Sequence, residues 1–123
     1  VLTQQIAVQD LMALGRFALL PDDDLTLAIV LKSPLVGLDE DALFTLAHGR
    51  AGSLWSELTR RRTNTTAFAD AHQFLSGILA RADYKTPFDF LNDRHLLSAL
   101  AINRPELTTN YIHLLDQEPF DEN

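Results

Sequence analysis

The chain has 123 residues, no cysteine and a formal net charge of -7, and these features limit what it can be. Its length suits one compact domain with a single core. An acidic surface repels phosphate backbones at long range, which argues against a free-standing nucleic-acid-binding protein. The lack of cysteine excludes disulfides, thiolate metal sites and cysteine nucleophiles, and it fits a cytoplasmic location. No apolar run reaches the length of about 20 residues that a membrane span needs, so we expect no membrane partner.

The first two predicted helices lie on either side of Pro21. Thr3 is the expected N-cap of the first, and apolar residues recur along it at steps of three and four. The second opens on Asp22–Asp24, where the helix macrodipole favours acids, and Pro34 ends it. Residues 25–31 are apolar nearly all round, so this helix is expected to form the buried centre of the domain.

The next two predicted helices begin at capping residues. Asp39 is the expected N-cap of the third, with Leu38 and Leu43 spaced as a hydrophobic staple and Gly49 after its end. Ser53 is the expected N-cap of the fourth, which ends in a run of arginines where cations suit the dipole.

The rest of the chain is also expected to be helical. A fifth helix over about 67–84 has an apolar stripe of two heptads. Further helices are expected from Thr86-Pro87, over 96–102 and over 107–115, followed by a flexible tail at 116–123. No segment shows the alternation of a strand. The sequence therefore predicts an all-α fold, a compact subdomain of about six to eight helices.

A search for catalytic, cofactor-binding and metal-binding motifs predicts no such residue. There is no phosphate-binding G-x-x-x-x-G-K-[ST] loop, and the glycines at 49 and 52 are explained by a helix end. Helix capping accounts for the acids at 22–24 and 39–41, which could otherwise be paired carboxylates or metal ligands. The histidines have no partner at metal-ligand spacing and are expected to be structural or solvent-facing: His48, His72, His95 and His113.

Two further features could contact a nucleic acid. Trp55 could stack on a base, although a core position beside Leu54 and Leu58 is the simpler interpretation. Arg60, Arg61 and Arg62 form the basic cluster of this acidic chain and are the candidate contact with DNA or a partner. A solvated helix end is the alternative for these arginines.

Four pieces of sequence carry a resemblance to a known family: "VLTQQIAVQDLMAL", "LPDDDLTLAIVLKSPLVGL", "LFTLAHGRAGSLW" and "AHQFLSGILARADYKTPFDFL". In order and spacing they resemble the helical 2B insertion of UvrD/Rep-type superfamily 1 DNA helicases, and among these the AddA subunits of AddAB helicase-nucleases. The resemblance covers Val1 to Leu91. It implies that residues 1–123 are one subdomain cut from a longer polypeptide, which the start at Val1 also suggests.

The resemblance also implies a function. The parent chain would be an ATP-dependent 3′-to-5′ DNA helicase of double-strand-break repair that uses ATP and Mg²⁺, while the 123-residue fragment would be inactive and hold no cofactor. Its partners would be DNA, through the parent enzyme, and an AddB-like nuclease subunit, with weak or no DNA binding by the fragment alone. A structural corner would pack one helical layer on the next through Ser33, Pro34, Leu35, Gly37 and Leu38. The alternative is an independent helical protein-interaction module without enzymatic activity.

Overall fold

The protein is helical throughout the part of the chain that the structure describes. A computed structural model describes the backbone of residues 2–82 and the side chains of residues 8–82, and no strand occurs in this range. The helices are α1 (Leu2–Leu19), α2 (Asp24–Lys32), α3 (Glu40–Ala47), α4 (Leu54–Arg60) and α5 (Thr66–Ala82). The predicted all-α fold is therefore confirmed. The helices expected from Thr86 onward and the tail at 116–123 lie outside the described residues.

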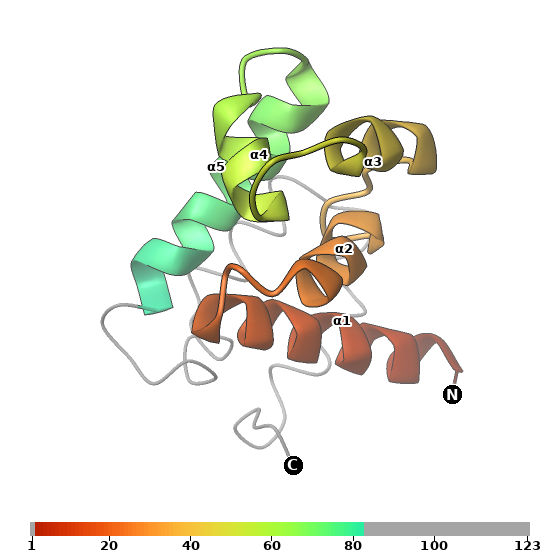
Figure 1. Ribbon diagram of the computed structural model, residues 1–123. Coiled ribbons are helices and arrows are strands. Elements are labelled where there is room, and N and C mark those ends of the chain that lie inside the picture. The colour runs from red at the N-terminus through yellow and green to blue at the C-terminus, as the bar shows by residue number, and fades with distance from the viewer. Residues whose placement is uncertain (1, 83–123) are drawn as a thin grey trace.

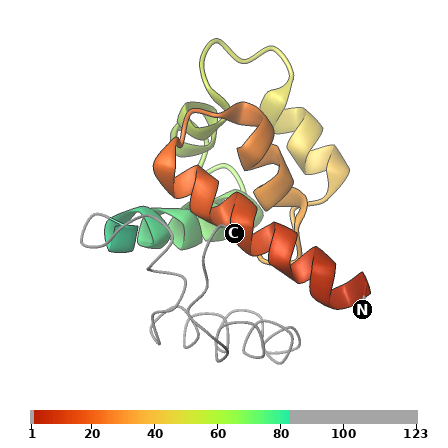
Figure 2. The ribbon, with the colours of Figure 1, turned by 90° about the horizontal axis from the view of Figure 1, so that it is seen from below.

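The short helix α2 lies at the centre of the arrangement. It packs along α1 on one side and contacts α3 and α4 on the other (Figure 1). The last described helix, α5, contacts both α1 and α4, and the view from below shows it running beside one end of α1 (Figure 2). The domain is thus a small helical bundle in which α5 covers one side.

The core takes side chains from all five helices. The largest fully buried ones are leucines, one isoleucine and one phenylalanine: Leu11, Leu14, Phe17, Leu27, Leu31, Leu46, Leu58, Leu75 and Ile78. Each contributes about 1.5–3 kcal/mol when removed from water. One continuous cluster links these residues, so the described helices share a single hydrophobic core.

The prediction that α2 forms the buried centre of the domain holds for one side of the helix and fails for the other. Leu27, Val30 and Leu31 are fully buried, but Leu25 is 75% exposed and Ile29 is 48% exposed. The helices that surround α2 leave one of its faces in solvent. Apolar residues on that face therefore stay accessible.

Local capping signals were mostly reliable. The Asp39 carboxylate accepts the Ala42 N–H at 2.7 Å, and Ser53 Oγ accepts the Ser56 N–H at 3.1 Å, which confirms both predicted N-caps. The cap predicted at Thr3 was wrong, because α1 already begins at Leu2. Helix ends commonly differ from sequence signals by one or two residues.

Candidate functional site

The segment between α2 and α3 forms one wall of a groove. Ser33 leaves the helical conformation at the end of α2, and its hydroxyl donates to the Val30 carbonyl at 2.6 Å. Gly37 has a φ of 75°, a left-handed conformation that glycine adopts without steric cost. Backbone hydrogen bonds close the turn. The Ser33 carbonyl accepts the Val36 N–H at 3.1 Å and the Gly37 N–H at 2.7 Å, and the Leu31 carbonyl accepts the Leu38 N–H at 2.8 Å.

The turn fixes the positions of the two leucines that follow the proline. Leu35 is 3% exposed and Leu38 is 6% exposed, so both belong to the core, whereas Pro34 is exposed. The segment is held by backbone hydrogen bonds on one side and by buried leucines on the other. We call residues 35–38 the corner segment.

The second wall of the groove is a face of α5. The core-facing stripe of this helix is buried and consists of Phe68, Ala71, Leu75 and Ile78, as the apolar spacing predicted. A neighbouring stripe is more exposed and contains Asp70, Phe74, Gly77 and Arg81, at helical spacings of four, three and four. This second stripe faces the corner segment.

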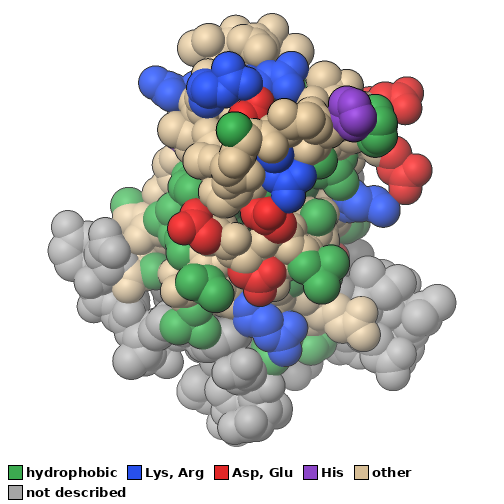
Figure 3. All heavy atoms as spheres, viewed as in Figure 1, with side chains coloured by type: hydrophobic (Ala, Val, Ile, Leu, Met, Phe, Trp, Pro, Cys, Tyr) green, Lys and Arg blue, Asp and Glu red, His purple; other side chains and the backbone are tan. Residues whose placement is uncertain are grey.

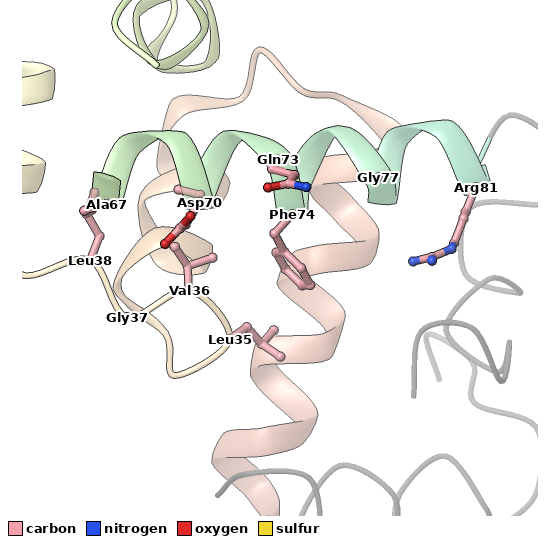
Figure 4. A pocket seen from close by; sticks show the side chains of 11 residues that line it. Leu35, Val36, Gly37, Leu38, Ala67, Asp70, Gln73, Phe74, Gly77 and Arg81 are labelled. Atoms are coloured by element: carbon pink, nitrogen blue, oxygen red, sulfur yellow. The ribbon is translucent and has the colours of Figure 1, made fainter. Parts of the chain in front are cut away.

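Together, the corner segment and α5 enclose a groove of about 520 Å³, which we call the corner–α5 groove. Phe74 extends from α5 toward Leu35 and Val36, while Asp70 and Arg81 extend from the same side of the helix near its two ends (Figure 4). A Cβ added at Gly77 would meet no atom within 4 Å, so the groove is open at this position. Its lining also includes Gly37, Leu38, Ala67, Ala71 and Gln73.

The first acidic cluster has a structural role in the described domain. Asp23 caps α2 by accepting the Thr26 N–H at 3.3 Å. Asp24 accepts hydrogen bonds from the Leu54 N–H at 2.8 Å and from the Arg50 guanidinium at 2.6 Å. These two hydrogen bonds hold the pKa of its carboxyl below the ordinary value. Asp24 thus ties the start of α2 to the start of α4.

The second acidic cluster lies at the start of α3, as predicted. Asp39 is the N-cap, and Glu40 and Asp41 occupy the first turn. Glu40 also pairs with Lys32 at 3.1 Å, although both side chains are largely exposed. Within the residues that the structure describes, no group of three or more His, Cys, Asp or Glu side chains could hold a metal ion.

The arginines predicted as a contact surface are bound within the domain. Arg60 pairs with Glu57, whose pKa is lowered first by this hydrogen bond. Arg61 donates to the Thr45 carbonyl at 2.9 Å, and Arg62 donates to the Thr59 carbonyl at 2.6 Å. Basic side chains gather over the α4–α5 connection, and acidic side chains lie on the middle of the same face (Figure 3). Arg62 therefore satisfies a carbonyl at the end of α4, and Arg61 links the end of α4 to α3.

Trp55 belongs to an aromatic stack that sequence reasoning did not anticipate. Its ring lies parallel to that of His72, with centroids 5.0 Å apart, and meets Phe17 edge-on at 5.2 Å. Burial, and secondarily the charge of Arg62, lowers the pKa of His72. The stack joins α1, α4 and α5, so Trp55 packs against other helices in the way its core interpretation expected.

The other histidine in the described residues lies away from this stack. His48 follows α3, and its exposed ring stacks on Phe44 with centroids 5.0 Å apart. The next residue, Gly49, has a φ of 72° and ends the helix, as predicted. His95 and His113 lie outside the described residues.

None of the helices within residues 2–82 combines the length and the apolar composition that a membrane span requires.

Comparison with known proteins places the chain next to uncharacterised sequences. A family model described as "Protein of unknown function (DUF2555)" matches residues 65–115. The uncharacterized protein ssl0461 of Synechocystis sp. (strain ATCC 27184 / PCC 6803 / Kazusa) is 46% identical over 44 residues, which are 36% of this chain and 53% of that protein. The chain thus spans about half the length of this relative. No solved structure matches.

These comparisons overturn the helicase resemblance. The matched family and the relative are a different kind of small protein, and neither is a UvrD/Rep or AddA helicase. The assignment to the 2B insertion of a superfamily 1 DNA repair helicase was therefore wrong. The resembling pieces were amphipathic helices, caps and a proline corner, features that recur in unrelated helical proteins. DNA and an AddB-like subunit were expected through this resemblance alone, and they stay untested predictions.

The corner–α5 groove was not found from the sequence. Ser33, Pro34, Leu35, Gly37 and Leu38 were identified as a structural corner, but nothing in their pattern indicated that α5 lies opposite. The available signal was the second stripe of α5, in which Phe74 and Gly77 stand between two opposite charges. In the part that the structure describes, α5 is also the element within the family match.

Proposed function

We propose that the described helical domain binds a segment of another protein in the corner–α5 groove. The observation that supports this proposal is an open groove of about 520 Å³ whose lining combines apolar side chains with polar and charged ones. Sites for small molecules usually gather a few polar groups around one point. Here Asp70, Gln73 and Arg81 are instead spread along a helix, which suits an elongated ligand (Figure 4). The proposal assigns no catalytic step to the domain.

Two predictions from the sequence accompany this proposal. The absence of a cofactor follows from the missing phosphate-binding motif, and a cytoplasmic location follows from the cysteine-free composition. Both remain predictions. They are compatible with a binding domain whose surface recognises another polypeptide.

Site-specific photo-crosslinking tests the proposal. The full chain, carrying p-benzoylphenylalanine in place of Phe74, is irradiated in an extract of its source cells, and crosslinked proteins are identified by mass spectrometry. The control carries the same group in place of Leu25, which is exposed on α2 away from the groove. We expect one protein to crosslink from position 74 and not from position 25.

A purified partner then allows a direct measurement. Gly77→Leu fills the groove and should abolish binding, whereas Gly77→Ala adds one methyl group in open space and should retain most of it. Circular dichroism of both variants checks that the helices are intact. Crosslinks from position 25 alone, or binding that survives Gly77→Leu in a folded protein, would refute the groove as the binding site.

A further inference from the structure

We infer that the partner segment is an amphipathic helix that lies antiparallel to α5, with an acidic residue at one end and a basic residue about three turns later. This inference rests on the proposed function, because it specifies what the corner–α5 groove binds. Its support is the order of charge, apolar surface and charge along the exposed stripe of α5.

The two charged residues of the groove mark its ends. Asp70 and Arg81 are eleven positions apart in α5, which corresponds to about 16 Å and about three turns. Eleven residues return to nearly the same side of a helix, so both side chains extend from one face (Figure 4). No ion pair joins either of them to another residue in the described part of the chain.

Between the two charges the groove is lined by apolar side chains and by Gln73, and it lacks a side chain at one position. Phe74 is half-buried and faces Leu35, and Gly77 follows one turn later with open space around it. Packed helices lie about 8–10 Å apart, and a glycine at the contact permits the closer spacing. A helix with an apolar stripe fits here, because its large side chains can fill the space above Gly77 and beside Phe74.

The charges at the two ends set the direction of the bound helix. A helix is stabilised by an acid near its N-terminus and a base near its C-terminus. Such a helix pairs its acid with Arg81 and its base with Asp70 only when its N-terminus lies at the C-terminal end of α5. In the antiparallel arrangement the macrodipoles of the two helices also point in opposite directions, which is the favourable arrangement for dipoles that lie side by side.

Synthetic helical peptides of about 15 residues test the inference, a length that spans the groove with one residue or two at each end. The first peptide has Glu near its N-terminus, Lys eleven residues later and a leucine stripe between them. The second is identical except that Glu and Lys are exchanged. Binding of each labelled peptide to the full chain is measured by fluorescence anisotropy. A spin label at the N-terminus of the peptide broadens the ¹H–¹⁵N signals of nearby residues and so shows whether this terminus lies near Asp70 or near Arg81.

A charge-reversed protein supplies the matched control. In the Asp70→Arg/Arg81→Glu variant the two charge changes cancel, so the net charge is that of the natural chain. The first peptide should lie antiparallel to α5 on the natural chain and the second should lie parallel to it, because only these directions pair Glu with Arg81 and Lys with Asp70. The variant should reverse both directions. Gly77→Leu should abolish binding of both peptides.

The other outcomes separate this inference from the proposed function. The same direction for both peptides, or no preferred direction, with binding abolished by Gly77→Leu, would overturn the charge-directed inference and leave the groove as a binding site. Absence of peptide binding would also overturn the inference. So would occupation of the groove by a second copy of the chain, which sedimentation experiments would detect as a dimer, or by another part of the same chain. In each case the photo-crosslinking experiment tests separately whether another protein binds in the corner–α5 groove.

Discussion

Asp24 joins three elements of the domain through one carboxylate. It stands in the first turn of α2, accepts the N–H of Leu54 at the start of α4 and pairs with Arg50, whose guanidinium also donates to the Ala47 carbonyl of α3 at 2.8 Å. Asp24→Ala should lower the free energy of unfolding by about 1–2 kcal/mol, because a helix-start N–H and a cation lose their partner. Urea denaturation measures the change.

The neighbouring Asp22 gives the control for this prediction. It carries the same charge and accepts a hydrogen bond from Ser53 Oγ at 3.1 Å in an exposed position. Asp22→Ala should therefore change stability by about 0.5 kcal/mol or less. The pKa of Asp24 is lowered in the folded state, so its contribution should persist above the ordinary value of 3.8 and be lost as the pH falls below it. Equal losses of unfolding free energy in Asp22→Ala and Asp24→Ala would show that Asp24 contributes no more to stability than its exposed neighbour.

His72 should make the aromatic stack sensitive to pH. Its folded-state pKa is lowered from the ordinary value of 6.5, so the folded protein binds fewer protons than the unfolded chain in the interval below that value. The stabilisation is complete above pH 6.5 and should be lost as the pH falls through the folded-state pKa. An NMR titration of His72 should give a midpoint below 6.5, and the pH dependence of unfolding should weaken in His72→Gln. A midpoint above 6.5 would show that stacking on Trp55 favours the charged imidazole.

The two faces of α2 give a prediction at the scale of a helix. Leu31 is fully buried and Ile29 is 48% exposed on the same helix. Leu31→Ala should lower the free energy of unfolding by about 2–5 kcal/mol, because it removes buried methyl groups and leaves a cavity. Ile29→Ala should cost less than about 1 kcal/mol, since alanine has the higher helix propensity. Chemical denaturation should show a lower midpoint for Leu31→Ala, and similar midpoints for both variants would mean that α2 is not central.

For helix α5 we predict a substitution that raises stability instead of lowering it. Gly77 lies in the interior of this helix, where glycine is less favourable than alanine, and an added Cβ would meet no atom within 4 Å. Gly77→Ala should therefore stabilise the protein by about 0.5–1 kcal/mol. Thermal unfolding by circular dichroism measures this gain, and a loss of stability would show that the position is filled in the folded protein.

The helices themselves were predictable because their signals are local. The caps at Asp39 and Ser53, the stop at Pro34 and the stripe of α5 each involve residues within one or two turns of each other. The exposure of Ile29 was not predictable in this way. It depends on which sides of α2 are covered by other helices, and an all-apolar segment does not encode that choice.

The corner–α5 groove depends on contacts between parts of the chain that are far apart in sequence. Leu35 and Phe74 come from segments separated by two helices, and their facing positions follow from packing of the whole core. The helicase resemblance failed for a related reason. Its evidence was a series of local helical patterns, and such patterns specify a fold class while leaving the function open.

The charge of the whole molecule leads to a prediction about DNA that does not depend on any family. A net charge of -7 opposes approach to a phosphate backbone. The basic cluster at 60–62 is also engaged internally, because Arg60 pairs with Glu57 and the other two arginines donate to carbonyls. Three phosphate contacts would give a salt slope of about -3 at most. The full chain should therefore bind duplex DNA weakly or not at all at physiological salt.

Fluorescence anisotropy with a labelled hairpin duplex tests this expectation at an ionic strength of about 0.15 M, where exposed charges are screened beyond about 8 Å. Binding that appears at low salt should vanish when Arg60, Arg61 and Arg62 are changed together to Gln. Lys32→Gln is the control, because Lys32 is a largely exposed cation that pairs with Glu40 at 3.1 Å and lies outside the cluster. Since non-specific binding requires several phosphate contacts, sub-micromolar affinity that survives the triple change would show that another surface of the chain recognises DNA.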